Sequence, residues 1–86
     1  MPEISRFFGI VVAIYFNDYP PPHFHAKYGE HKAKVDVATG TILEGNLPRR
    51  ARALLEEWRL LHKAELEAVW TKIRDREPYD KIAPLE

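Results

Sequence analysis

Two histidines separated by a single residue follow a run of three prolines in residues 20–25. Alternate side chains of a β-strand point to the same face, so His23 and His25 lie side by side if this segment is a strand. Two neighbouring imidazoles can bind a metal ion, transfer a proton or hold an anion. The sequence thus offers three kinds of chemistry at one place, and the surrounding elements must decide between them.

A metal site at His23 and His25 needs a third ligand, because two side chains alone bind an ion weakly. The sequence offers four candidates for that ligand: Asp18, His31, Asp36 and His62. Spacing alone selects none of them, and we therefore predict no metal or other cofactor. If a metal binds, His23 and His25 are its expected ligands.

The two histidines lie in a predicted β-hairpin formed by residues 23–28 and 31–38. Gly29-Glu30 is its expected turn, since glycine readily supplies the positive φ that a two-residue turn needs. In this register one face of the hairpin is mostly apolar and the other is wholly polar, as a half-buried hairpin requires. The polar face pairs Lys27 with Lys32, His25 with Lys34, and His23 with Asp36.

This polar face suggests anion binding and catalysis. Like charges directly opposite each other destabilise a sheet, so Lys27, Lys32 and Lys34 favour a phosphate or carboxylate ligand. The alternative is a solvated face whose lysines block aggregation. A carboxylate opposite His23 would orient its imidazole as a general base, which makes His23, His25 and Asp36 candidate catalytic residues for phosphodiester cleavage. The alternative for that pair is a surface ion pair.

Three arginines begin the helical part of the chain: Arg49, Arg50 and Arg52. Positive charge there opposes the helix macrodipole, whose N-terminus is already positive. The arginines therefore suggest an external anion or an acidic protein partner, and solvated side chains are the alternative.

The composition bounds the class of protein. The chain has 86 residues and a formal net charge of zero, which argues against a protein that coats nucleic acids and leaves self-association open. The absence of cysteine excludes disulfides, thiolate zinc sites and a Cys nucleophile. The N-terminal residues lack the layout of a signal peptide, and the longest mostly apolar run, residues 7–16, is too short for a membrane helix. We expect a cytoplasmic protein.

The pattern of apolar residues predicts a single α+β domain over residues 1–86, with a β-rich part (1–46), a helical part (47–77) and an extended tail (78–86). Strands are expected near residues 4–8, 10–16, 23–28, 31–38 and 41–44, forming a small antiparallel sheet of four or five short strands. A straight helix over residues 48–76 would span ~43 Å, which is long for such a domain. A kink near residues 61–64, giving two helices, is therefore the expected alternative to one helix.

Several segments together resemble one known family. They are residues 4–10, 15–18, 21–29, 47–51 and 82–85, with Trp58, His62, Glu65 and Leu66. The family is a set of short bacterial proteins catalogued as domain of unknown function 4160. The resemblance implies an intracellular bacterial or phage protein that is the toxin-like component of a two-gene, toxin–antitoxin-type module. It implies no catalytic residues.

Three functions remain open. The first is a toxin-like component that acts on or binds RNA or a nucleotide through the histidine and lysine face. The second is a non-enzymatic module that binds a small acidic protein, encoded by an adjacent gene, through the arginines. The third is a metal-binding protein that uses His23 and His25.

Overall fold

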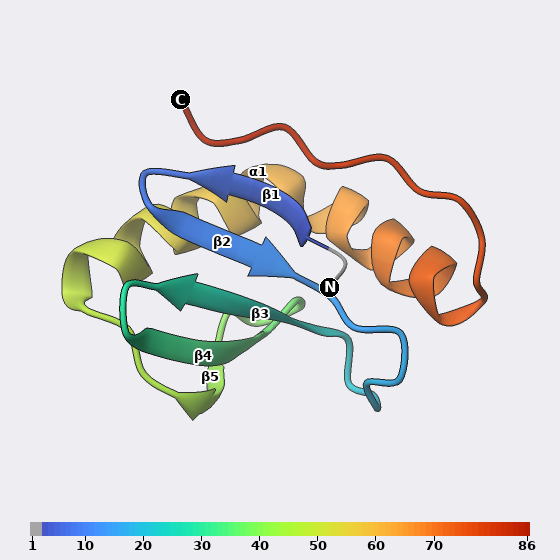
Figure 1. Cartoon of the computed structure of the whole chain (residues 1–86), viewed down its shortest axis with the longest axis horizontal. Helices are drawn as coiled ribbons and strands as arrows, with labels where there is room; N and C mark the ends of the chain where they lie inside the picture. Colours follow the sequence, from blue (N-terminus) through green and yellow to red (C-terminus); the bar gives the residue numbers. More distant parts are fainter. Residues whose placement is uncertain (1–2) are drawn as a thin grey trace.

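The first half of the chain folds into a five-stranded antiparallel sheet in the computed structural model, which describes residues 3–86 (Figure 1). Each strand pairs with the next one in sequence, which confirms the predicted α+β class. The predicted domain spans residues 1–86, and its first two residues lie outside the part that the structure describes. The strands are β1 (Glu3–Phe7), β2 (Ile10–Ala13), β3 (His23–Tyr28), β4 (His31–Asp36) and β5 (Ile42–Gly45).

The β3–β4 hairpin has the register predicted from its alternation. His23 lies opposite Asp36, and Lys27 lies opposite Lys32. Gly29 opens the turn with a φ of 57°, the left-handed value that glycine adopts most readily. The polar and apolar faces of the hairpin are therefore those expected from the sequence.

Strand β2 ends at Ala13, three residues earlier than its apolar run suggests. The chain turns away because the Tyr15 amide donates to the Asp18 carboxylate at 3.4 Å, and the Asp18 amide donates to the Tyr15 carbonyl at 3.3 Å. These contacts begin a loop that leads to the prolines and β3. The early end of β2 thus brings a carboxylate toward the start of β3.

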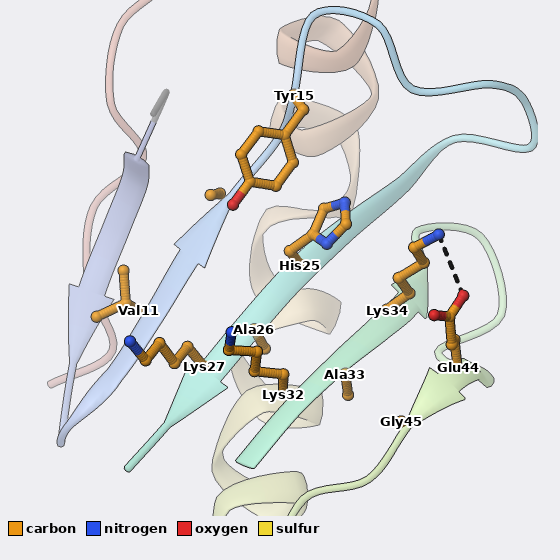
Figure 2. A pocket seen from close by; sticks show the side chains of 11 residues that line it. Val11, Tyr15, His25, Ala26, Lys27, Lys32, Ala33, Lys34, Glu44 and Gly45 are labelled. Carbon is orange, nitrogen blue, oxygen red and sulfur yellow. Dashed lines mark ion pairs between the residues drawn. The ribbon is translucent and has the colours of Figure 1, made fainter. Parts of the chain in front are cut away.

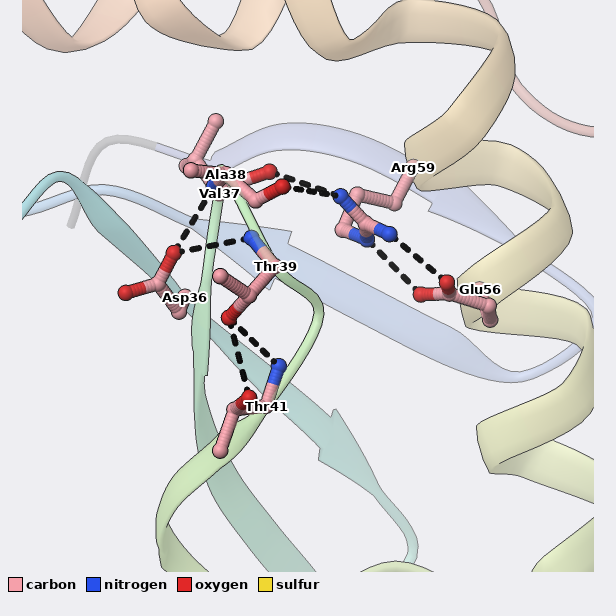
Figure 3. Close-up of polar contacts among 7 residues, drawn as sticks. All are labelled: Asp36, Val37, Ala38, Thr39, Thr41, Glu56 and Arg59. Atoms are coloured by element: carbon pink, nitrogen blue, oxygen red, sulfur yellow. Dashed lines mark hydrogen bonds and ion pairs between the residues drawn. The ribbon is translucent and has the colours of Figure 1, made fainter.

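Strand β4 ends at Asp36 rather than Ala38. The Asp36 carboxylate accepts hydrogen bonds from the amides of Ala38 and Thr39, at 2.8 and 3.0 Å (Figure 3). These bonds favour a turn over a continued strand, because the side chain takes the place of strand pairing.

The helical part is one helix, α1 (Arg49–Arg74), which follows Pro48 as its N-cap. A division into two helices is therefore not confirmed. Its backbone leaves helical values at His62 (φ −121°, ψ 22°), within residues 61–64. Within the described part of the chain, no helix is apolar enough over a sufficient length to cross a membrane.

Helix α1 covers one face of the sheet (Figure 1). Trp58 is fully buried at the centre of this layer, with its ring 5.2 Å from that of Phe7 and 5.9 Å from that of Phe24. After a turn at residues 75–76, the chain returns without regular structure past the end of α1, and its last part lies beside β1 (Figure 1). The Ile82 amide donates to the Ile4 carbonyl at 2.8 Å, which holds this tail against the edge of the sheet. The opposite face of the sheet is left for polar side chains.

Candidate metal centre and the adjoining hollow

Three side chains meet where the loop after β2 enters β3: Asp18, His23 and His25. The Asp18 Oδ2 atom lies 3.0 Å from Nε2 of His25 and 3.4 Å from Nε2 of His23. One nitrogen or oxygen atom from each residue lies within 4.8 Å of the other two. The two imidazole rings are neighbours, 5.4 Å apart between centroids, as their alternation in a strand predicts. We call this group the Asp-His-His cluster.

His23 is the most buried member of the cluster, with 6% of its surface exposed. Its Nδ1 lies 2.9 Å from the Pro21 carbonyl oxygen. A carbonyl only accepts hydrogen bonds, so Nδ1 carries a proton; when the ring is neutral, Nε2 then presents a lone pair. That Nε2 atom is buried and has no hydrogen-bond partner among residues 3–86. The ring packs 5.2 Å from Trp70, so the lone pair is held within the cluster by the surrounding structure.

His25 and Asp18 complete the cluster from the more open side. His25 is half-buried, and its ring meets the Tyr15 ring in a T-shaped arrangement, with a centroid distance of 4.5 Å and an interplanar angle of 81°. The Tyr15 amide donates to the same Asp18 oxygen that faces both histidines. The loop therefore fixes the carboxylate, while β3 fixes the imidazoles.

The two separations from the Asp18 carboxylate to the histidines are compatible with a metal ion. Ligand bonds to zinc of about 2.0–2.1 Å in a tetrahedral site place neighbouring ligand atoms about 3.3 Å apart. The two distances to the Asp18 oxygen, 3.0 and 3.4 Å, bracket that value. Ligating histidines also commonly donate their second N–H to a backbone carbonyl, as His23 does to Pro21. Two imidazoles and one carboxylate fit zinc or another divalent transition metal.

Asp18 occupies the place that the strand register suggested for Asp36. Asp36 does lie opposite His23, but its carboxylate accepts hydrogen bonds from the following turn. His62 is not part of the cluster, and its Nδ1 lies 2.7 Å from Glu65 Oε1 on the same helix. His31 is exposed at the hairpin turn. Of the four third-ligand candidates in the sequence, Asp18 is the one that joins the two histidines.

A hollow of about 480 Å³ adjoins the cluster on the sheet face opposite α1 (Figure 2). We call it the lysine-lined hollow, because Lys27, Lys32 and Lys34 all line it. His25 lines it as well and so belongs to both the hollow and the cluster. Lys34 pairs with Glu44 at 3.2 Å. Lys27 and Lys32 form no ion pair within residues 3–86.

The structure separates the arginines from these lysines. Arg49 and Arg50 are exposed at the start of α1. Arg52 lines a different hollow of about 350 Å³, between the sheet and the helix. The six basic residues predicted to bind an anion or a partner therefore do not line one common hollow.

A second buried polar group was not predicted from the sequence. Arg59 on α1 donates to the carbonyls of Val37 and Ala38, at 2.8 and 3.3 Å (Figure 3). It also donates to both carboxylate oxygens of Glu56, at 2.7 and 2.6 Å. These bonds hold the pKa of Glu56 below its ordinary value and raise the pKa of Arg59. The i, i+3 spacing of Glu56 and Arg59 was the available signal, but such pairs are common on exposed helices.

Comparisons with known proteins identify a family without assigning an activity. No curated protein and no solved structure matches the chain significantly. A family model matches residues 9–71, which is more than half of the chain and includes the Asp-His-His cluster and the lysine-lined hollow. The chain therefore belongs to the family described as Domain of unknown function (DUF4160).

Proposed function

We propose that this protein binds a divalent transition metal, such as Zn²⁺, through Asp18, His23 and His25. The observation that carries the proposal is the Nε2 atom of His23, which is buried, oriented by Pro21 and without a hydrogen-bond partner in the described residues. A buried polar atom left in this state costs about 1–3 kcal/mol. A metal ion bound by Nε2 would remove that cost.

Three protein ligands leave at least one coordination position free for water or a substrate. This is the pattern of catalytic zinc sites, whereas structural zinc sites usually use four protein ligands. A bound metal there would act as a Lewis acid and would lower the pKa of its water. The open side of the cluster, at His25, faces the lysine-lined hollow. Metal chemistry on a molecule held in that hollow is the activity that this arrangement favours.

Metal binding is tested with tag-free protein by elemental analysis and by calorimetric titration with Zn²⁺. We expect one ion per chain, and at least about tenfold weaker binding in Asp18→Asn and His25→Ala, since each variant removes one of three ligands. His31→Ala is the matched control, because His31 is exposed and lies outside the cluster. Failure to bind zinc, manganese, iron(II) or nickel in stoichiometric amounts would contradict the proposal.

The toxin-like function acting on RNA or a nucleotide stays a prediction, supported by the family resemblance and by Lys27 and Lys32, which form no ion pair among the described residues. Induced expression should then arrest growth and degrade RNA, and the His23→Ala/His25→Ala double variant should do neither. Unchanged growth and intact RNA with the unmodified protein would count against it. Bacterial origin and cytoplasmic location also stay predictions.

The acidic protein partner is likewise a prediction, supported by the exposed Arg49 and Arg50 at the start of α1. The partner expected is the product of a neighbouring gene. Co-expression and pull-down should recover a complex that Arg49→Ala/Arg50→Ala weakens. No complex at micromolar concentration would contradict this prediction.

A further inference from the structure

The charges in the lysine-lined hollow are not balanced by ion pairs among residues 3–86. Lys27 and Lys32 lie directly opposite each other on β3 and β4, an arrangement that destabilises a sheet when both side chains are charged. Glu44 pairs with Lys34, and neither of the other two lysines has an acidic partner within residues 3–86. An anion placed between Lys27 and Lys32 would supply the missing negative charge.

The size and walls of the hollow describe the rest of the ligand. Its volume of about 480 Å³ falls within the range of about 300–1,000 Å³ that is typical of small-molecule sites. Val11 and Ala13 contribute apolar surface, and the Tyr15 ring stands at the side near His25 (Figure 2). This surface suits a flat or apolar group attached to an anionic one.

A long polyanion fits the molecule less well. A strand of nucleic acid is normally held by a basic groove that follows its backbone. Here the arginines of α1 do not line the lysine-lined hollow, and the chain carries no net positive charge. The basic residues on this face form a local site and not an extended track.

We propose that the lysine-lined hollow binds a small molecule that carries a phosphate group. Lys27 and Lys32 contact the phosphate, whose charge of nearly −2 matches the charge of the two ammonium groups. Tyr15 and the apolar wall contact the rest of the molecule. The inference rests on the proposed metal site in one respect, since a metal bound at His25 would give the phosphate a second contact.

The probes for this inference are adenosine 5′-monophosphate, adenosine and a 12-nucleotide RNA. Calorimetry in EDTA should show binding of the monophosphate and no binding of adenosine. Lys27→Ala/Lys32→Ala should weaken monophosphate binding by at least about tenfold, because each substitution removes a charge-assisted contact. Both lysines are exposed, so the variant should fold. Lys63→Ala, an exposed lysine on α1, is the control and should bind as the unmodified protein does.

A second titration separates this inference from the metal proposal. With one equivalent of Zn²⁺, monophosphate binding should tighten in the unmodified protein and stay unchanged in Asp18→Asn. Zinc binding without monophosphate binding would overturn the inference alone. Lysine-dependent monophosphate binding without zinc binding would overturn the metal proposal alone. Equal binding of adenosine, or RNA binding that is much tighter and depends on the same lysines, would overturn the small phosphorylated ligand.

Discussion

Arg59 and His23 are both almost fully buried, with 4% and 6% of their surfaces exposed, but they differ in how many hydrogen bonds their side chains make. Arg59 donates four hydrogen bonds, to two carbonyls and to both oxygens of Glu56 (Figure 3). His23 makes one, to Pro21, and its second nitrogen has no hydrogen-bond partner in the part of the chain that the structure describes. Buried polar groups are normally satisfied, so the two residues have different reasons to be inside.

The difference separates a structural group from a ligand site. Arg59 donates to two carbonyls in the turn after β4, of which that of Val37 belongs to a buried residue, and thus attaches that turn to α1. Nε2 of His23 lies beside a carboxylate and a second imidazole, which is the arrangement on which the proposed metal site rests. Loss of Arg59 should therefore damage the fold, whereas loss of His23 should damage binding.

The largest expected effect is that of Arg59→Met. The substitution keeps much of the apolar stem but removes every donor, so the carbonyls of Val37 and Ala38 lose their side-chain partner. We expect the free energy of unfolding in urea to fall by about 2–4 kcal/mol. Arg50→Met, an exposed residue on the same helix, should change it by no more than about 0.5 kcal/mol.

His23→Leu should have the opposite profile. Without metal its stability should lie within about 1 kcal/mol of the unmodified protein, because the lost bond to Pro21 is offset by removal of the unpartnered nitrogen. Zinc at a hundredfold excess over its dissociation constant should stabilise the unmodified protein by about 2.7 kcal/mol and leave His23→Leu unchanged. Thermal unfolding with and without zinc measures both. If His23→Leu without metal lost as much stability as Arg59→Met, His23 would also be a structural residue, and the distinction between the two residues would be wrong.

Gly40→Ala tests how tightly the Glu56 and Arg59 side chains pack against the turn after β4. A Cβ atom at Gly40 would lie 2.5 Å from Glu56 Oε1 and 2.7 Å from Arg59 Nε, at a φ of +77°. We expect a loss of about 2 kcal/mol in unfolding free energy. Gly29→Ala is the matched control, since its φ is +57° and nothing lies within 4 Å, so it should cost only about 1 kcal/mol. Equal losses in the two variants would mean that the side chains of Glu56 and Arg59 can move aside at little cost in stability.

The smallest expected effect is on the stability of the protein at acidic pH. The hydrogen bonds from Arg59 hold the pKa of Glu56 below 4.5, so the ionised carboxylate is favoured in the folded state. That contribution is present above pH 4.5 and is lost as pH falls through the lowered pKa. Glu56→Gln should therefore flatten the decline of stability between about pH 5 and pH 3. Urea unfolding across that range checks it, and an unchanged slope would show that solvent already screens this half-exposed carboxylate.

What could be predicted from the sequence was local. The register of β3 and β4 follows from alternation and from the glycine turn, both of which act between near neighbours in the chain. Asp18 could be named as a candidate ligand but not chosen, because its position depends on a loop whose turn arises from the Tyr15 contacts. Arg59 looked like an ordinary helix-surface residue, since its carbonyl partners lie more than 20 positions away in the sequence.

The tail bound along β1 has a consequence for assembly. With the Ile82 amide already on Ile4, a strand arriving from another molecule meets an occupied rim on that side. The rim at β5 is mostly exposed. Two copies joined at β5 about a twofold axis would have β1 at both outer edges, where each copy's own tail already occupies the Ile4 carbonyl. Addition of further strands at those edges would then compete with the tail.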